Sequence, residues 1–495
     1  MTFLGSIYLR TLTGGVYEHY MRIIISKPIC PHFFFESVTL LPMSNILPPA
    51  LVRRLGNSAG FDTAAFEAVH EQEGGFTAIR ANTAKWKAPT GITVDPVPWC
   101  DTGYYLTNRP IFTLDPLFHA GCYYVQEASS MFVAHAIRAL GLDKQPLIAL
   151  DLCAAPGGKS TLLNSYLHVN SLLIANELIK TRATALTDNL VRWGQSNTIV
   201  SNNDPSAFGN LPGYVDLLLV DAPCSGSGMF HKDHEAVNAW SEAAVQLCRE
   251  RQQRILATSL PALKEGGVLL YSTCSYSTEE NEQIADWLCD TQGLEPIYVP
   301  VAAEWRIEQT QSDKHACPGY RFYPHKLRGE GFFLAAFRKV IKQPTFDRRK
   351  PKSERAAVPA LGKWVANADD YFTFTIGEDI HILPKKWEAD LYTLRNMLYL
   401  RNAGTYVGWI ANGDLIPAHD LALSLARRMD LPMLTLTKDD ALEYLRKGNL
   451  APVINAQGLR GWVLAGYEDV ALGWMKVLPN RINNYYPKAW RIATM

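Results

Sequence analysis

Residues 147–160 read LIALDLCAAPGGKS, and this stretch decides the fold class. Its first part, 147–152, is apolar except for Asp151, a pattern that is typical of a strand buried on both faces of a sheet. A Gly-rich turn follows, and the periodicity of residues 161–167 predicts a helix directly after it. The order of strand, tight turn and helix predicts the first unit of an α/β sheet.

The pattern continues along the chain. Further apolar strand runs lie at 172–176, 215–220 and 267–271, and helical periodicity separates them at 178–192 and 241–264. Strands that alternate with helices predict a mostly parallel sheet with helices on both faces. Ligands of such sheets bind beyond the carboxyl ends of the strands, so the residues that end each strand are the candidates for chemistry.

Composition divides the rest of the chain. Residues 338–355 hold eight basic residues against two acids, which indicates a linker, and the alternating, Gly-punctuated runs after 360 predict a small β-rich domain. We predict five parts, in chain order: a poorly structured extension at 1–42, a small α+β module at 43–124, the α/β domain at 125–340, a basic linker at 341–360 and a β-rich region at 361–495.

Length and composition exclude several classes of protein. The chain has 495 residues, of which 47% are hydrophobic and 19% charged, so disorder, collagen and coiled coil are poor fits. Lys and Arg number 48 and so do Asp and Glu, so no global positive field predicts a nucleic-acid partner. Nine cysteines without a C-x-x-C pair favour a reducing cytoplasm and predict no metal site. Charged residues interrupt every apolar run near the N-terminus, which predicts no membrane span.

The turn at 153–159 suits a ligand. It carries small side chains and two glycines, so backbone N–H groups can approach a bound molecule closely. It matches neither the P-loop nor G-x-G-x-x-G, so an adenosine with an amino-acid tail fits better than a triphosphate. Glu177 closes the second strand run, where a carboxylate can accept from two ribose hydroxyls. A plain helix N-terminal charge is the alternative for that acid.

Two cysteines end strands. Cys224 lies in the sequence DAPCSG at 221–226, and Cys274 in STCS at 272–275, each directly after an apolar run. Cysteine is usually a small buried hydrophobe, and we keep that interpretation for Cys100, Cys122, Cys248, Cys289 and Cys317. At a strand end, however, a thiolate can add reversibly to an electron-poor ring carbon.

These motifs together resemble a known family. The sequence is similar to the RNA 5-methylcytosine methyltransferases of the Nol1/Nop2/Sun group at 150–159, 221–226 and 272–275, and also at YVQEASSM (124–131) and at RFYPH (321–325) with GFF (331–333). The RsmF type is favoured, because a C-terminal extension follows the catalytic domain and too little chain precedes it for an N-terminal helical domain of the RsmB type.

The resemblance implies a Rossmann-like S-adenosylmethionine-dependent methyltransferase domain, an N-terminal RNA-binding module and a C-terminal PUA-like RNA-binding region. It implies Cys274 as the nucleophile, Cys224 as the cysteine that helps to release the product, and Asp221 as an acid that serves catalysis and the cofactor site. The implied cofactor residues are Cys153, Ala154, Ala155, Pro156, Gly157, Gly158, Lys159, Glu177, Asp204 and Asp221. The Asp204 match has no flanking signature.

The resemblance also implies the reaction. Cys274 would add to C6 of a cytosine, so that C5 can attack the methyl group of S-adenosylmethionine. We expect 16S rRNA or the small ribosomal subunit as the partner, and a monomer in the cytoplasm. Two alternatives stay open: methylation of tRNA, and an RNA-binding assembly factor that has lost turnover. The presence of both cysteines and Asp221 favours an enzyme.

Overall fold

The computed structural model describes residues 47–493, except for 58–60, 73, 87–93, 343, 345, 347–357, 359, 449, 451–455 and 457. The predicted extension at 1–42 and most of the predicted linker at 341–360 therefore lie outside the described residues. Residues 47–493 belong to one compact unit. No helix in the described part of the chain is long and apolar enough to cross a membrane.

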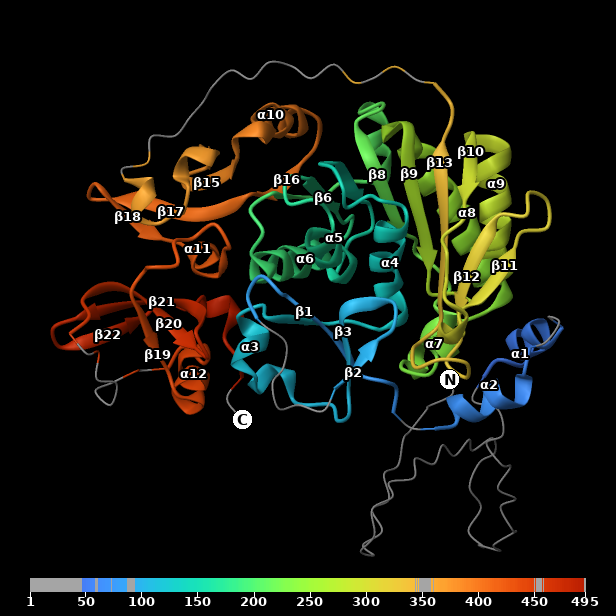
Figure 1. Cartoon of the computed structure of the whole chain (residues 1–495), viewed down its shortest axis with the longest axis horizontal. Helices are drawn as coiled ribbons and strands as arrows, with labels where there is room; N and C mark the ends of the chain where they lie inside the picture. The colour runs from blue at the N-terminus through green and yellow to red at the C-terminus, as the bar shows by residue number, and fades with distance from the viewer. Residues whose placement is uncertain are drawn as a thin grey trace, which may run out of the picture. The chain divides into compact units, whose positions relative to one another are not determined.

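A ten-stranded sheet forms the centre of this unit (Figure 1). Its order is β11-β12-β13-β9-β8-β5-β6-β7-β16, and β10 also pairs with β13. The five strands from β9 to β7 are parallel, and those beyond them on either side pair antiparallel. The bounds are β5 Ile148–Asp151, β6 Leu172–Asn176, β7 Thr198–Ser201, β8 Val215–Asp221, β9 Leu263–Thr273, β10 Leu294–Ile297, β11 Glu308–Gln311, β12 Pro318–Phe322, β13 Phe332–Lys339 and β16 Leu400–Ala403.

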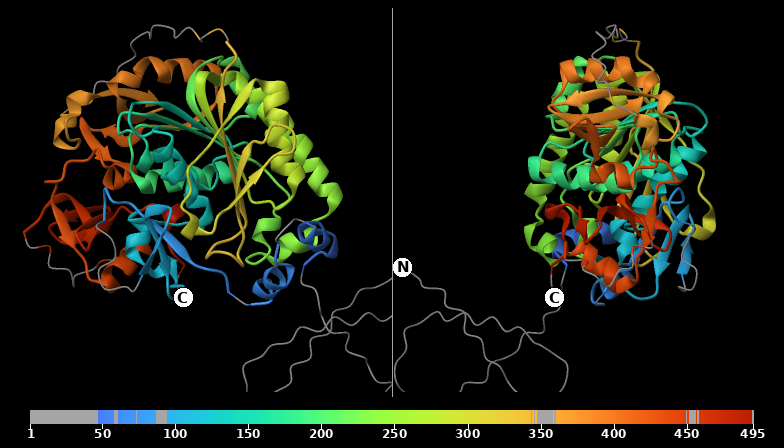
Figure 2. Two further views of the ribbon diagram at one scale, coloured as in Figure 1. Left: turned by 45° about the vertical axis from the view of Figure 1, so that its right-hand side comes forward. Right: turned by 90° about the vertical axis from the view of Figure 1, so that its left-hand side faces the viewer.

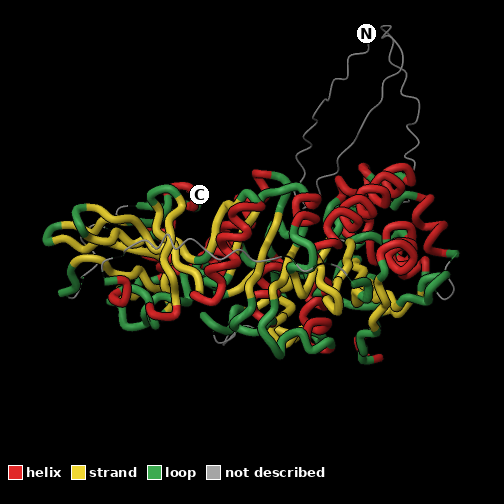
Figure 3. The backbone as a smooth tube through the Cα atoms, turned by 90° about the horizontal axis from the view of Figure 1, so that it is seen from above, coloured by secondary structure: helices red, strands yellow, loops and turns green. Residues whose placement is uncertain are grey.

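Helices cover both faces of the sheet (Figures 2 and 3). Ala149 and Leu173 face one hydrophobic core with residues of α4 (Phe132–Ala139), α5 (Gly158–Tyr166) and α6 (Lys180–Trp193). Their neighbours in sequence, Ile148 and Leu172, face a second core with residues of α8 (Glu242–Ser259), α9 (Glu282–Gln292) and α10 (Glu388–Met397). Successive residues of a strand point to opposite faces, so continuous apolar runs need this double cover.

The predicted parallel sheet with helices on both faces is confirmed for the five central strands. The sheet as a whole is mixed, because the five strands beyond them pair antiparallel. The predicted helix at 241–264 is too long, because α8 ends at Ser259 and β9 begins at Leu263. Pro261 lies between them, and a proline cannot continue a helix interior. The sequence reasoning did not single out β7, which has only four residues. It also predicted no strand of the central sheet after residue 340, whereas β16 extends that sheet by pairing with β7.

In its described residues, the N-terminal module holds three α-helices and an antiparallel sheet of order β2-β3-β1-β4. Its elements are α1 Pro49–Gly56, α2 Thr63–His70, β1 Ala78–Ala81, β2 Val94–Val97, β3 Cys100–Leu106, α3 Pro116–His119 and β4 Tyr123–Val125. Arg80 leaves β1 to donate to Gln126 Oε1 (2.9 Å) and Thr161 Oγ1 (2.6 Å), and its guanidinium lies over the Trp193 ring. Burial lowers the pKa of Arg80 to about 10. The module thus holds α5 and α6 in place.

The C-terminal region holds two four-stranded sheets, β14-β15-β17-β18 and β19-β20-β21-β22. The bounds are β14 Tyr371–Ile376, β15 Asp379–Pro384, β17 Thr405–Ala411, β18 Asp414–Pro417, α11 His419–Leu423, β19 Met433–Thr435, α12 Lys438–Leu445, β20 Gly461–Tyr467, β21 Val470–Leu478 and β22 Arg481–Asn484. The last sheet shares a hydrophobic core with the N-terminal module, in which Leu434 and Tyr486 lie with Cys122 and Tyr123.

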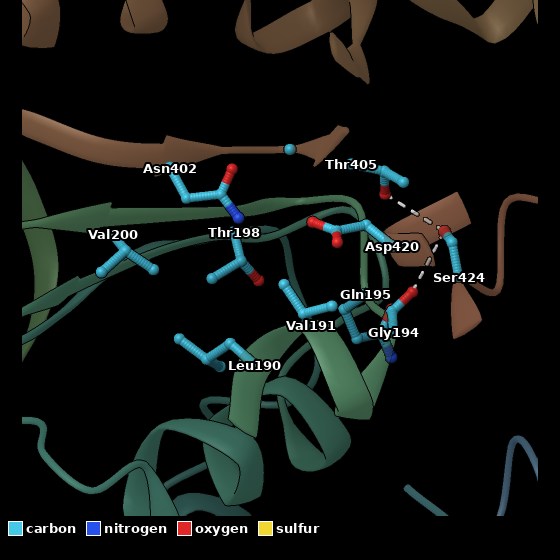
Figure 4. Close-up of a pocket in the computed structure, with 11 residues that line it drawn as sticks. Leu190, Val191, Gly194, Gln195, Thr198, Val200, Asn402, Thr405, Asp420 and Ser424 are labelled. Atoms are coloured by element: carbon cyan, nitrogen blue, oxygen red, sulfur yellow. Dashed lines mark hydrogen bonds between the residues drawn. The ribbon is translucent and has the colours of Figure 1, made fainter. Parts of the chain in front are cut away.

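A pocket marks the junction between α6, β7 and the C-terminal region (Figure 4). Ser424 joins the two sides, because its hydroxyl lies 3.1 Å from Thr405 Oγ1 and donates to the Gly194 carbonyl at 3.4 Å. Burial raises the pKa of Asp420, which lines the pocket, to about 7. Neither strand-end cysteine lines this pocket, so it is not the predicted catalytic site.

Candidate active site

The turn between β5 and α5 is held by α6. Gly157 has a φ of +114°, a left-handed conformation that disfavours any side chain, and it precedes the first residue of α5. Arg182 donates to the Ala155 carbonyl (2.9 Å), and Asn189 Nδ2 donates to the Pro156 carbonyl (2.8 Å). Two side chains of α6 therefore fix the backbone of the predicted cofactor loop.

Glu177 lies buried at the end of β6. Its carboxylate accepts from the Ile179 backbone N–H (2.8 Å) and lies 3.6 Å from Arg182. Asn202 Nδ2 donates to the Glu177 carbonyl (2.6 Å), which ties this position to the end of β7. The acid thus combines a helix-start contact with a place at the carboxyl edge of the sheet, so both readings from the sequence have a structural basis.

Asp204 lies one strand further along, exposed to solvent. Its carboxylate caps a short 3₁₀ helix at 205–210 by accepting from the Ser206 N–H (2.9 Å) and hydroxyl (2.6 Å), and these hydrogen bonds lower its pKa. The preceding Asn203 exchanges hydrogen bonds with Asn176 at the end of β6. Asp204 therefore lies on the loop beside the one that carries Glu177.

Asp221 ends β8 and is held from two sides. Its Oδ2 accepts from Lys159 Nζ (2.8 Å), and its Oδ1 accepts from Ser272 Oγ (2.8 Å) at the end of β9. Burial alone would lower the pKa of Lys159. The opposite effect of Asp221, Asp151 and Cys274 is larger, so the pKa of the lysine is raised. The contact pairs an ammonium with a carboxylate at the centre of the carboxyl edge.

The two strand-end cysteines meet. The sulfurs of Cys224 and Cys274 lie 3.0 Å apart, and both are free thiols. The contact with Cys274, together with burial, raises the pKa of Cys224 well above its ordinary value. The two thiols share one S–H···S contact, in which either sulfur can be the donor. That arrangement suits Cys274 as the nucleophile.

The cofactor loop fits a ligand with several polar groups. Asp151, directly before this loop, is fully buried; its Oδ2 accepts from Ser160 Oγ (2.6 Å), whereas its Oδ1 has no partner among the described residues. Burial and the nearby Asp221 raise the pKa of Asp151 to about 7, although the Ser160 bond opposes this. A buried acceptor without a partner indicates a donor from a bound molecule. Burial also raises the pKa of Cys153, which stays a neutral thiol.

The structure brings the predicted residues to one edge of the sheet. The loop at 153–159, Glu177, Asp221 and the two cysteines follow β5, β6, β8 and β9, and Asp204 follows β7. Sequence reasoning missed Ser272, which fixes Asp221, and Glu280, which contacts the residues after both cysteines. The signal available in the sequence was the group of three acids at 279–282, which follows closely after a predicted strand end. A carboxylate that is buried at such a place usually has a partner.

Three family models match consecutive parts of the chain. Residues 139–338 match "16S rRNA methyltransferase RsmB/F", residues 47–128 match "N-terminal domain of 16S rRNA methyltransferase RsmF", and residues 432–492 match "Methyltransferase RsmF PUA domain". "Ribosomal RNA small subunit methyltransferase F" of Shewanella sediminis is 31% identical over 440 residues, which cover 83% of this chain and 89% of the relative. The chain belongs to this methyltransferase F family.

Further comparisons agree with this family. The methyltransferase F of Vibrio parahaemolyticus is 30% identical over 83% of this chain and 90% of its own length. The crystal structure of NSun6 from Pyrococcus horikoshii with SFG is 20% identical, with a TM-score of 0.50 over 60% of this chain and 99% of that chain, and shows the fold. As a member of the methyltransferase F family the chain is an RNA methyltransferase, and its methyl donor is S-adenosylmethionine. The predicted family, fold class and cofactor are confirmed.

Proposed function

We propose that the chain methylates C5 of a cytosine in 16S rRNA through a covalent adduct with Cys274. The names of the curated relatives and the family models support this RNA. The observation that carries the mechanism is the 3.0 Å approach of the Cys224 and Cys274 sulfurs. Asp221 and Lys159 lie at the end of the adjoining strand β8 and at the start of α5. One nucleophile, one proton acceptor and one charged pair are the groups that addition to a pyrimidine ring requires.

The chemistry proceeds from these side chains. The Cys274 thiolate forms a bond to C6 of the cytosine, and the electron pair of the C5–C6 double bond moves into the ring. Asp221 with Lys159 holds the N3 and N4 edge, where charge develops during this addition. S-adenosylmethionine would supply the methyl group that C5 takes up, and would leave as S-adenosylhomocysteine when its bond from sulfur to that methyl group breaks. Cys224 or a water that it positions then removes the C5 proton, and the electrons of that C–H bond restore the double bond as the bond from Cys274 to C6 breaks.

The remaining assignments belong to the same proposal. Residues 153–159, Glu177, Asp204 and Asp221 hold S-adenosylmethionine. RNA binds to the module at 43–124 and to the region at 361–495. The linker at 341–360 joins the second of these to the catalytic domain at 125–340. The target cytosine leaves its stack to reach Cys274. The chain acts as a monomer in the cytoplasm, where ribosomal RNA is modified.

The adduct provides the test. Cys224→Ala protein incubated with S-adenosylmethionine and small-subunit rRNA should accumulate a protein–RNA species that survives a denaturing gel, because the step that releases Cys274 is blocked. The doubly substituted Cys224→Ala, Cys274→Ala protein is the control and should give no such species. Normal turnover without an adduct in Cys224→Ala would overturn the role of Cys224. Bisulfite sequencing of treated rRNA and tRNA identifies the substrate, and methylation of tRNA alone would contradict the proposed RNA.

A further inference from the structure

Glu280 is a fully buried acid that follows Cys274 by six residues in the sequence. It ends a short 3₁₀ helix, 278–280, that follows β9, and its own backbone carbonyl accepts from the Tyr271 hydroxyl at 2.6 Å. Its carboxylate has four donors around it: the backbone N–H (2.8 Å) and hydroxyl (2.6 Å) of Ser225, the hydroxyl of Ser275 (2.6 Å) and Nε2 of Gln252 (3.3 Å). Both oxygens of this buried carboxylate therefore accept hydrogen bonds.

These donors flank the two cysteines. Ser225 directly follows Cys224, and Ser275 directly follows Cys274. Gln252 also donates to the carbonyl of Pro223 (3.1 Å), the residue before Cys224. One carboxylate thus joins the loop after β8 to the loop after β9, at the positions that set the direction of each thiol.

Other contacts between the loops are of a different kind. The Gly228 N–H donates to the Cys274 carbonyl (2.8 Å), and the Tyr276 N–H donates to Ser227 Oγ (2.9 Å). These bonds keep the loops in contact without Glu280. The residues next to the two cysteines also meet directly, because the Ser225 and Ser275 hydroxyls lie 3.3 Å apart. Both hydroxyls donate to Oε2 of Glu280, which holds them in that contact.

We propose that Glu280 is a positioning residue that sets the distance between the Cys224 and Cys274 sulfurs. Neither oxygen touches a thiol in the structure, so Glu280 acts through Ser225 and Ser275. The proposal deepens the proposed function, because the spacing matters for turnover only if both cysteines act on one base. It is tested first by a measurement that needs neither RNA nor turnover.

The distance itself can be probed with diamide. A thiolate adds to the azo nitrogen of diamide, and the second thiolate displaces the resulting hydrazine, so two thiols become one disulfide while diamide takes up two electrons and two protons. The sulfurs of Cys289 and Cys317 lie 3.4 Å apart in a different part of the catalytic domain and serve as an internal reference. Peptide mapping by mass spectrometry follows both disulfides in one sample.

Glu280→Gln should slow closure of the Cys224–Cys274 disulfide about tenfold or more, while Cys289–Cys317 closes at the wild-type rate. The amide keeps the shape of the side chain but turns one acceptor into a donor, which faces donors. In turnover, kcat should fall at least tenfold, while the KM for RNA and the binding of S-adenosylmethionine change less than threefold. Equal closure of Cys224–Cys274 in wild type and variant would overturn the positioning role, whatever the activity.

Two more variants guard against a folding defect. The double variant Ser225→Ala, Ser275→Ala removes both hydroxyl donors but keeps the acid, and should reproduce the slow closure and the low kcat. Glu282→Gln is the matched control, because Glu282 is a buried acid two residues away that binds Arg321 and Thr310 instead of the cysteine loops. It should lower the melting temperature yet leave closure and kcat near wild type. If Glu282→Gln slowed closure as much as Glu280→Gln, general loosening would replace the proposal.

Discussion

Cys274 is the side chain on which the proposed chemistry depends. Its sulfur contacts that of Cys224, and among the described residues no hydrogen bond joins it to the loop at 153–159. Cys274→Ala should therefore abolish methyl transfer while S-adenosylmethionine binds within a few-fold of wild type. Calorimetry with the cofactor and a methyl-transfer assay measure the two effects. Loss of cofactor binding in a folded Cys274→Ala protein would show that the residue has another role.

Glu177 should control cofactor affinity. A carboxylate can pair with both ribose hydroxyls, and a charge-assisted hydrogen bond contributes roughly 1.5–3 kcal/mol. Glu177→Gln keeps an oxygen for the Ile179 N–H but loses the charge, so the Kd for S-adenosylmethionine should rise by one to two orders of magnitude. Titration calorimetry measures it. An unchanged Kd would leave Glu177 with only its contact to the start of the helix.

The proposed catalytic side chains could be singled out from the sequence because each lies at or just after the end of a strand, within a recognisable motif. Residues that act through a neighbour were harder to predict. Ser272 was quoted only as part of a motif, and Glu280 was not considered, because burial of an acid depends on donors that are 28 and 55 positions away in the sequence. The contact between Lys159 and Asp221 likewise joins residues 62 positions apart. Sequence patterns describe local order, and these contacts are made by the fold.

At the scale of elements, the loop after β7 links the C-terminal region to the cofactor site. The side chain of Asn203 accepts from the Tyr399 N–H and donates to the Tyr399 carbonyl, both at 3.0 Å. Asn203→Ala removes both bonds, each contributing about 1 kcal/mol. We expect a several-fold rise in the Kd for S-adenosylmethionine, because Asp204 follows directly.

Arg395→Ala is the control for this prediction. Arg395 lies in α10, and its guanidinium donates to the Thr375 carbonyl within the C-terminal region. The substitution should leave cofactor binding unchanged. If Asn203→Ala and Arg395→Ala bind the cofactor equally well, the contact with Tyr399 does not support the site.

The elements themselves differ in how far sequence predicts them. Long apolar runs such as 215–220 became β8 almost residue for residue. The four residues of β16 carry no apolar run, and burial along the strand is partial, so their pairing with β7 follows from tertiary structure alone. The aromatic residues near the C-terminus also differ in burial: Trp474 and Tyr486 are buried in the core, whereas Tyr485 stays 37% exposed.

For the whole molecule, zero net charge leaves RNA binding to local basic segments. Arg348, Arg349, Lys350 and Lys352 lie in the predicted linker, outside the described residues. Replacing all four with Ala should weaken RNA binding, and each lost phosphate contact should reduce the slope of log affinity against log salt by roughly 0.7–0.9. Filter binding across a salt series measures the slope, and S-adenosylmethionine binding is the control. A slope equal to wild type would assign RNA capture to other surfaces.

Buried histidines couple stability to pH. Burial lowers the pKa of His381 to about 4, from 6.5, and its ring stacks between Phe374 and Tyr406. As the pH falls from 6.5 to 4, the unfolded chain binds a proton that the folded chain cannot, so this histidine destabilises the fold progressively. Buried carboxyls with raised pKa values, such as Asp151, act in the opposite direction, so the comparison must be between variants.

His381→Phe keeps an aromatic ring between the two neighbours and removes the titrating group. Above pH 6.5 the variant should be the less stable protein, because it lacks the hydrogen bond of His381 Nδ1 to the Ala403 carbonyl. Between pH 6.5 and 4 the difference in melting temperature from wild type should shrink. Calorimetric melting at several pH values measures it, and a constant difference would contradict the assignment of a lowered pKa.

The late position of β16 in the chain has a consequence for how the protein is synthesised. Ser201 ends β7, and its partner Leu400 in β16 is synthesised about 200 residues later. At roughly 5–20 residues per second, β7 waits on the order of 10–40 seconds on the ribosome with one edge unpaired. An unpaired strand edge is a template for aggregation. Chains released early, before about residue 403, would keep that edge open, so incomplete products should be preferred substrates for chaperones and proteases over the finished enzyme.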